Sequence, residues 1–453
     1  MTDTLLSSSQ PGNSNRERVH KSLAGRHRSE TMFRWAGILS IAAALGFVAI
    51  LFGMIISKGL PSFWQSTLHV EVYFDPELIE GGPQPQRADS PSEADYQQAM
   101  IQWQRDVTLS NWNAIVETAV RTAAPEFEIE SRDILALVTS AARFQLRDRY
   151  FANPDVLGQT MDVSLLASAN TDNWLKGTID RSLADERQQL SPEIRQLADQ
   201  LREEGTISFD FAWHIFTNVD SRSAPASAGL AGAFMGSLYM MMVVIVLAVP
   251  IGVASAVYLE EFAPKNRLTD LIEVNINNLA AVPSIVFGLL GAAVFINYLG
   301  LPRSAPLVGG LVLTLMTLPT IIIATRSSLR AVPPSLRQAA LGLGASRNQT
   351  VFHHVLPLTF PGILTATIIG VAQALGETAP LLLIGMSAFI ANIPANPLDS
   401  ATALPVQIYL WQGNENRNFF EARTSAAIMV LLGMMILLNA IAIFLRTRLE
   451  RRK

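Results

Sequence analysis

The sequence predicts an all-α membrane protein with six transmembrane helices, an N-terminal anchor followed by a five-helix core, and a soluble helical domain inserted between the first two spans. Three observations predict this fold class. Of the 453 residues, 49% are hydrophobic and only 16% are charged. The apolar residues gather in runs of about 20, the length that crosses a bilayer. The acidic residues gather in one long block without such a run.

Charge divides the chain into two kinds of segment. Residues 58–227 carry 14 Lys and Arg against 26 Asp and Glu, a net charge of −12, whereas the rest carries a net charge of +8. An acidic, soluble-looking block is therefore inserted into an apolar, mildly basic chain. Cysteine is absent, which excludes a disulfide staple and any Cys-based metal or redox site. The basic residues lie in short tails and loops, a distribution that does not favour nucleic-acid binding.

The apolar runs define six candidate spans, since ~20 apolar residues cross a hydrocarbon core ~30 Å thick. They lie at about 33–57, 228–259, 274–299, 306–325, 361–390 and 425–445. The first is too long for the apolar region of a signal peptide, so we interpret it as a retained anchor. The second is longer than a span requires, so we expect it to tilt or to kink at Pro250.

Lys and Arg in the short flanking segments predict the orientation of the spans. Both tails are basic, and so are the loops after the second and fourth spans, whereas the opposite short loops carry few basic residues. We therefore expect both termini on the cytoplasmic side and the acidic block outside. Arg326 and Arg330, at the inner end of the fourth span, either anchor that end at the membrane surface or draw an anion inward.

A long loop, residues 326–358, separates the fourth and fifth spans on the predicted cytoplasmic side. After Pro333-Pro334, Ser335 can cap a short helix. Gly344 follows, and glycine destabilises an isolated helix by ~1 kcal/mol relative to alanine, a cost that close approach of another surface would justify. Pro357 is expected to stop a second short helix from running into the fifth span. Two angled helices with a glycine corner suit docking into a groove of a soluble partner.

This loop resembles the coupling loop of ABC importer permeases, a motif written EAA, three residues, Gly, nine residues, Ile, any residue, Leu-Pro. The motif positions are occupied here by Gln338, Ala339, Ala340, Gly344, Leu356 and Pro357. Gln338 replaces the usual Glu and His354 replaces the usual aliphatic residue, but the spacing is kept. The resemblance implies that the loop seats in a cleft of an ATP-hydrolysing subunit. An ordinary amphipathic loop is the alternative interpretation.

The chain itself is not expected to be an enzyme. It contains no G-x-x-x-x-G-K-[ST] loop for nucleotide phosphates, so a permease of this kind would depend on a separate ATPase chain. We predict no catalytic residue, no metal site and no cofactor. His353 and His354 are adjacent, so on a helix they point about 100° apart and make a poor chelating pair.

A narrower resemblance covers about residues 210–450. The stretches that carry it are VPSIVFGLLG (282–291), LPTIIIATRSSLRAVP (318–333), LGASRNQT (343–350), VLPLTFPGILT (355–365) and ALGETAPLLLIG (374–385). Together they resemble the PstA family of phosphate permeases and occur in that family's order. The resemblance implies a bacterial inner-membrane subunit that imports inorganic phosphate by alternating access. It implies as partners a second permease, PstC, an ATPase dimer, PstB, and a periplasmic phosphate-binding protein, PstS.

Candidate residues for the translocation path lie mainly in the fifth predicted span. They are Gln373, Gly376, Glu377 and Thr378, together with Asn278 at the start of the third span. An ionisable residue inside a span is expensive and by default faces the bundle interior or an aqueous cavity. Glu377 is therefore expected to pair with an arginine or to act as a gate, unless it is a buried glutamate that holds two helices together. The family often has Arg at the position of Gln373, so the positive charge for phosphate is expected elsewhere, as on PstC. Asn278 either lines the path or makes capping and interhelical hydrogen bonds.

The acidic block is where the resemblance ends. Residues 81–92 are typical of a Gly/Pro-rich linker, and helical patterns follow at about 93–122, 131–150 and 191–204. Residues 206–218 are expected to rejoin the core as an interfacial segment carrying Phe and Trp. The predicted division is a tail at 1–32, a span at 33–57, a mostly helical periplasmic insertion at 58–210, a permease core at 211–446 and a tail at 447–453.

Two other functions are compatible with the sequence. The same architecture could carry another substrate, such as sulfate, molybdate or an amino acid. A different class is a signalling scaffold, in which the outward domain senses phosphate status and passes it to a cytoplasmic kinase. Uptake of phosphate by a reconstituted complex would separate phosphate import from import of another substrate. Transport that persists after deletion of residues 80–205, with signalling lost, would support a signalling role alongside transport.

Overall fold

The computed structural model describes residues 12–127 and 129–450, so the predicted tail residues 1–11 and 451–453 lie outside the described residues. The described residues up to Ser57 form one unit, and those from Lys58 onward form a second. The first unit holds most of helix α1 (Gly12–Gly59), which contains the predicted anchor at 33–57. Within Gly25–Phe63, the most apolar stretch is long enough to cross a membrane, and its side chains are exposed. The helix is therefore suited to contact with lipid along that length.

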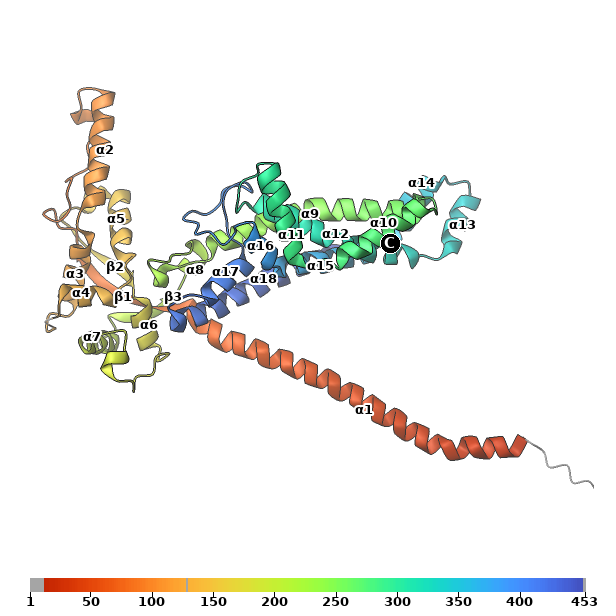
Figure 1. Ribbon diagram of the computed structural model, residues 1–453. Coiled ribbons are helices and arrows are strands. Elements are labelled where there is room, and N and C mark those ends of the chain that lie inside the picture. Colours follow the sequence, from red (N-terminus) through yellow and green to blue (C-terminus); the bar gives the residue numbers. More distant parts are fainter. Residues whose placement is uncertain (1–11, 128, 451–453) are drawn as a thin grey trace, which may run out of the picture. The chain divides into compact units, whose positions relative to one another are not determined.

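The acidic block is mostly helical, as predicted, but it folds around a three-stranded sheet, which corrects the prediction of an all-α chain (Figure 1). Its strands are β1 (Trp64–Tyr73), β2 (Thr160–Leu166) and β3 (Ile207–Phe211). They pair antiparallel in the order β2-β1-β3, with Val70 opposite Val163 and Thr67 opposite Ser208. The strand β1 alternates between buried and exposed residues from Leu68 onward, which is the pattern of a half-buried strand.

Helices cover the inner face of this sheet. They are α2 (Glu93–Leu109), α3 (Trp112–Ala123), α4 (Ser131–Ile134), α5 (Ala142–Ala152), α6 (Ala169–Leu175) and α7 (Pro192–Glu203). The 3-10 turns η1 (Leu60–Phe63), η2 (Arg87–Asp89), η3 (Leu135–Leu137), η4 (Pro154–Val156) and η5 (Asp185–Arg187) link the elements. These helices confirm the patterns predicted at 93–122, 131–150 and 191–204. Side-chain caps set several of the starts: Ser92, Asn111, Ser168 and Ser191 each accept a hydrogen bond from a backbone N–H three residues on.

We call residues 64–211 the sheet domain, because one hydrophobic core runs from the first strand to the third. Leu68 and Ile207, on the outermost strands in sequence, are both fully buried in the cluster that also holds Trp103 and Trp112. The predicted linker at 81–92 therefore lies inside the domain and does not mark its edge. There Gly81 has φ of +98° and packs beside Trp103, and the Trp103 indole donates to the carbonyl of Gly82.

A buried arginine joins the sheet domain to the helices that follow. Arg423, on α18 (Arg417–Glu450), is 2% exposed and donates to the carbonyls of Ala226 and Ala228. It also donates to the side chains of Gln65 on β1 and of His214 on α8 (His214–Thr217). The bond to Gln65 thus ties the first strand of the sheet domain to α18, and the other three bonds tie the segment that follows the sheet domain to the same helix.

The remaining helices form a membrane bundle, with the sheet domain beyond one of its ends and the loop helices α13 and α14 at the other (Figure 1). Its helices are α9 (Ala231–Val257), α10 (Arg267–Ala280), α11 (Ser284–Gly291), α12 (Pro306–Arg330), α15 (Leu356–Gly376), α16 (Ala379–Leu383), α17 (Leu404–Gln412) and α18. A 3-10 turn, η6 (Pro225–Ser227), precedes the bundle, and π-helical turns η7 (Tyr258–Phe262) and η8 (Ala292–Tyr298) extend α9 and α11.

Small residues let the bundle helices approach closely, as is usual in membranes. Ile321 of α12 fills the space between Gly252 of α9 and Gly370 of α15. A Cβ atom built on Gly252 would lie 2.8 Å from the Ile321 side chain, and one on Gly370 would lie 3.0 Å from it. Alanine at position 252 would therefore push α12 away from α9.

The third predicted span, 274–299, is not one straight helix. Its residues belong to α10 and to the α11–η8 segment, which meet at an angle of 100°. Pro283 lies at the break. It has no backbone N–H to donate, and its ring disfavours helical backbone angles at the preceding residue. Five helices of the described chain are long and apolar enough to span a membrane, and the count reaches six only if this bent pair is one span.

The fifth predicted span, 361–390, is also wrong at its far end. Helix α15 ends at Gly376, Glu377 is extended with φ −79° and ψ 130°, and a new helix of five residues, α16, begins at Ala379. Pro380 at the start of α16 favours this break, since its ring cannot be placed within a continuing helix without loss of a hydrogen bond. The residues from Gly385 to Ala403 then form no helix.

Candidate functional site: the loop helices and the polar face

The predicted loop at 326–358 starts inside α12, which ends at Arg330, and its first separate element is the short exposed helix α13 (Pro334–Gly342). Ser335 does not cap it as predicted, because Pro333 is the N-cap and Ser335 already lies inside the first turn. Gln338 and Ala339 are exposed, while Ala340 is 7% exposed and faces the rest of the chain. Gly344 has φ of +90°, a conformation that L side chains rarely adopt, and turns the chain after the helix.

The second half of the loop starts with a well-defined cap. Ser346 accepts from the backbone of Gln349, and the Gln349 side chain accepts from the backbone of Ser346, which completes a capping box for α14 (Arg347–Gln349). The helix then continues through the π turn η9 (Thr350–Val355) into α15. Leu356 and Pro357 are half-buried at the start of α15, so Pro357 does not stop the helix as predicted. Proline lacks an N–H, and the π turn lies where its helical hydrogen bond would have been.

Three leucines make the outer surface of the loop apolar. Leu336 is 44% exposed, Leu341 is 50% exposed and Leu343 is 90% exposed. An apolar side chain that is almost fully exposed beside a glycine turn is expected at a contact surface rather than in free solution.

Ion pairs fix α13 to the ends of the bundle helices, and sequence reasoning missed them. Arg337 of α13 donates from Nη2 to Glu261 of η7 at 2.6 Å and to the carbonyl of Leu329 at 2.9 Å. From Nη1 it donates to the carbonyl of Val332 at 2.7 Å. The Glu261 side chain is only 9% exposed, so this pair is well shielded from solvent. A pair of this kind is strengthened by its hydrogen bonds to neighbouring groups.

A second group of ion pairs ties α9 and α10 to α12. Arg326 contacts Glu260 of η7 at 3.3 Å and Glu273 of α10 at 2.5 Å, and Arg330 contacts Glu260 at 3.0 Å. Arg326 and Arg330 are therefore paired with carboxylates, and neither presents an open cation to an anion. A displacement of α13 would move Glu261. Because Glu261 is adjacent in sequence to Glu260, the displacement would also reach the ion pairs that join α9, α10 and α12.

The candidate path residues lie on an incompletely covered face of the bundle. Gln373 and Gly376 are exposed, and Glu377 and Thr378 are half-buried. The Thr320 hydroxyl donates to the Gln373 side-chain oxygen at 3.3 Å. Glu377 stands at the break between α15 and α16 rather than inside a span, and within the described chain its carboxylate has no hydrogen-bond or ion-pair partner. At this break the backbone at Gly376 and the partly exposed carboxylate of Glu377 lie on the same face of the bundle.

Asn278 does not join this cluster by any contact among the described residues. It lies in α10, where it is exposed, and within the described residues its side chain makes no interhelical hydrogen bond and no helix cap. Its backbone carbonyl accepts from the N–H of Ala281, the C-cap of α10, at 3.0 Å. The polar face therefore comprises Thr320, Gln373, Gly376, Glu377 and Thr378.

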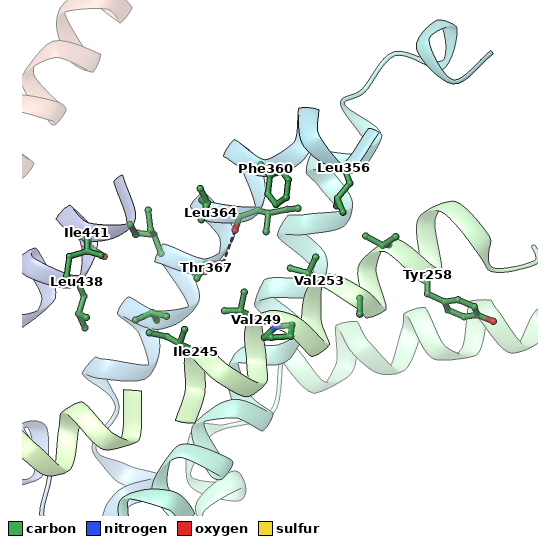
Figure 2. Close-up of a pocket in the computed structure, with 18 of the residues that line it drawn as sticks. Ile245, Val249, Val253, Tyr258, Leu356, Phe360, Leu364, Thr367, Leu438 and Ile441 are labelled. Atoms are coloured by element: carbon green, nitrogen blue, oxygen red, sulfur yellow. Dashed lines mark hydrogen bonds between the residues drawn. The ribbon is translucent and has the colours of Figure 1, made fainter. Parts of the chain in front are cut away.

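A groove between α9, α15 and α18 is large enough for a ligand, but it does not suit an anion (Figure 2). It encloses about 830 Å³, and Val249, Leu364 and Leu438 are typical of its lining. The Thr367 hydroxyl in its wall is already bonded to the carbonyl of Ile363 at 3.0 Å. Moving a charged group into such surroundings would be strongly unfavourable.

Long apolar helices, a loop helix fixed to their ends by ion pairs and an uncovered polar face define a multi-pass membrane permease. Residues 248–453 match the family described as binding-protein-dependent transport system inner membrane component. The phosphate transport system permease protein PstA 1 of Mycobacterium tuberculosis H37Rv is 36% identical over 228 residues, which are 50% of this chain and 73% of that protein. The chain therefore belongs to this family of ABC importer permeases. It is a non-catalytic subunit, and ATP hydrolysis belongs to a separate one.

Other relatives are also similar over part of this chain. The PstA of Xylella fastidiosa Temecula1 is 29% identical over 224 residues, 49% of this chain and 76% of that protein. The probable ABC transporter permease protein YqgI of Bacillus subtilis 168 is 34% identical over 168 residues, 37% of this chain and 56% of that protein. The inward-facing MetNI methionine ABC transporter covers 49% of this chain and 95% of the matched chain, at 21% identity and a TM-score of 0.37. Residues 20–185 match a separate domain of unknown function, DUF3333.

Proposed function

We propose that this chain imports inorganic phosphate across the bacterial inner membrane as one of two permease subunits. The observation that carries the proposal is the similarity to proteins named phosphate transport system permease protein PstA, over about half of this chain and nearly three quarters of theirs. The partners in this proposal are PstC as second permease, a PstB dimer as ATPase and PstS as periplasmic binding protein. Both termini would then be cytoplasmic and the sheet domain periplasmic.

The loop helices are the proposed docking site for the ATPase. Gln338, Ala339 and Gly344 are exposed, and the nearby exposed leucines would lose water on docking. Leu356 and Pro357 belong to the base of the site, since they are half-buried where the loop returns to the bundle. Arg337 would transmit movement, because it is bonded at once to η7 and to the carbonyl end of α12.

The polar face is the proposed half of a translocation path. Thr320, Gln373 and Thr378 offer hydrogen bonds, but a phosphate dianion also needs positive charge. Glu377 instead carries a negative charge, and among the described residues no Lys, Arg or His side chain pairs with it. We assign the missing cation to PstC, which would cover this face, pair with Glu377 and hold phosphate between the two subunits.

Reconstitution of the complex in liposomes tests the substrate. ATP-dependent accumulation of labelled phosphate is expected, and unlabelled sulfate, molybdate or amino acid should not compete with it. Accumulation of one of these alternatives without phosphate would overturn the proposal while leaving the permease assignment intact.

A further inference from the structure

Five aromatic residues gather on the surface at the base of the sheet domain. The aromatic patch comprises Phe63, Trp64, Phe211, Trp213 and Phe216. Phe63 stacks on Phe211 and Phe216 at centroid distances of 6.4 and 5.8 Å, and Trp213 meets Phe211 edge-on at 4.7 Å. The patch is therefore one packed unit, although its residues come from two segments far apart in the sequence.

This packed unit is open to its surroundings. Trp213 is 69% exposed, Trp64 is 44% exposed and Phe216 is 43% exposed. Within the described residues, neither indole N–H of Trp64 or Trp213 has a hydrogen-bond partner. Contiguous exposed aromatic area on a folded domain marks a contact surface.

The position of the patch relates it to the membrane. Phe63 ends the apolar segment Gly25–Phe63, and its carbonyl accepts from the backbone of Ala212 at 2.8 Å. Just before it, Lys58 pairs with Glu421 of α18 at 2.5 Å, and Gly59 packs against the backbone of Ser425. The patch thus lies at the level where α18, a membrane helix, begins.

Charge at this level is also typical of an interface. Lys58 and Glu421 are each about half exposed, so a pair of charged side chains is accessible where α18 begins. Trp combines a large apolar ring with one N–H donor, and for that reason it is enriched where lipid headgroups meet hydrocarbon.

We propose that the aromatic patch inserts into the headgroup region of the bilayer on the side of the sheet domain. The rings of Trp213 and Phe216 would lie among the upper acyl chains, and the free indole N–H groups would donate to lipid ester or phosphate oxygens. The contact seats the sheet domain on the membrane surface. The inference depends on the membrane spans and not on the identity of the transported substrate.

Quenching by brominated lipid tests this contact in the assembled complex. The complex is placed in bilayers of phosphatidylcholine brominated either near the headgroup end of its chains or near the chain termini. Trp213→Phe removes one fluorophore and keeps an apolar ring, so folding is preserved. Trp112→Phe is the matched control, because Trp112 is only 4% exposed in the core of the sheet domain.

The expected result is that shallow bromines quench more strongly than deep ones, and that Trp213→Phe removes a measurable part of this quenching. Trp112→Phe should leave the quenchable part unchanged. Equal shallow quenching in wild type and Trp213→Phe would overturn the proposal. Quenching of Trp213 in the isolated chain that disappears in the complex would also overturn it, because a protein partner would then cover the patch.

Discussion

Arg423 donates from Nη2 to Nε2 of His214, 3.0 Å away, so the imidazole presents a lone pair to a buried cation. A protonated His214 would instead place two positive charges in contact. Burial, and after it the charge of Arg423, lower the pKa of His214 to about 3 from an ordinary value of 6.5. Lys176 on α6 lies nearby, and burial lowers its pKa as well, against the opposing effect of Asp172. The junction between the sheet domain and the bundle therefore favours the neutral form of the His214 imidazole.

This arrangement predicts loss of stability in acid. The unfolded chain protonates His214 near pH 6.5 and the folded chain near pH 3, so the unfolded state binds more protons between these values. Stability from His214 is complete above about pH 6.5 and falls as the pH drops towards 3. In His214→Gln the unfolding temperature should fall less between pH 6.5 and 4. His353→Gln, exposed on η9, should follow the wild type, and a parallel fall in His214→Gln would contradict the prediction.

The pair of Arg337 and Glu261 predicts a loss of coupling on charge reversal. Arg337→Glu should release α13 and reduce co-purification of the ATPase subunit, because a shielded pair becomes a repulsion. Adding Glu261→Arg should restore part of it, with a shortfall from the lost hydrogen bonds to Leu329 and Val332. Arg330→Gln is the control with a smaller effect, since the Arg330 side chain is 60% exposed. No recovery in the double variant would mean that Arg337 acts through something other than Glu261.

The two glycines of the loop should respond differently to the same substitution. Gly342→Ala has open space and ordinary backbone angles, so function should persist. Gly344→Ala also has open space, but its φ of +90° strains any L residue by about 1 kcal/mol or more. ATP-driven uptake should fall in Gly344→Ala alone. If both variants behave alike, the turn at Gly344 is not what positions the docking surface.

Glu377 should matter for transport more than for assembly. Glu377→Gln keeps the size of the side chain and removes the charge that we assign to pairing with PstC. Phosphate uptake should drop several-fold while the yield of complex is kept. Glu415→Gln, exposed in the loop before α18, serves as the matched control. A proportional loss of yield and uptake would make Glu377 a packing residue.

Local patterns in the sequence predicted the elements that depend mainly on residues close together in the chain. Runs of apolar residues gave the positions of α1, α9, α12 and α18, and motif spacing located the loop with α13 and Gly344. Gly376 and Pro380 predicted close helix packing and a local break within one continuous span, but together they end one helix and start another. The alternation in β1 was passed over because helical patterns surround it.

Long-range contacts were not predictable in the same way. Nothing local relates Arg337 to Glu261 or Arg326 to Glu273, since each pair joins separate helices whose angle is fixed only in the fold. The same holds for Arg423, which the structure buries against Gln65 and His214.

The bounds of the sheet domain predict which deletion removes the whole domain and leaves the rest of the chain folded. Deleting 80–205 would take away β2 and the covering helices but leave β1, whose Leu68, Val70 and Val72 would lose their core. Exposed strands of this kind aggregate, so that variant should be poorly recovered.

Excising 64–211 instead joins Phe63 to Ala212, which are already hydrogen-bonded at 2.8 Å, and a short Gly/Ser bridge suffices. It also removes Gln65, but Arg423 keeps the carbonyls of Ala226 and Ala228 as acceptors. The second variant should insert, resist protease in its bundle and take up phosphate. Correct insertion without uptake would mean that the sheet domain takes part in the transport cycle itself.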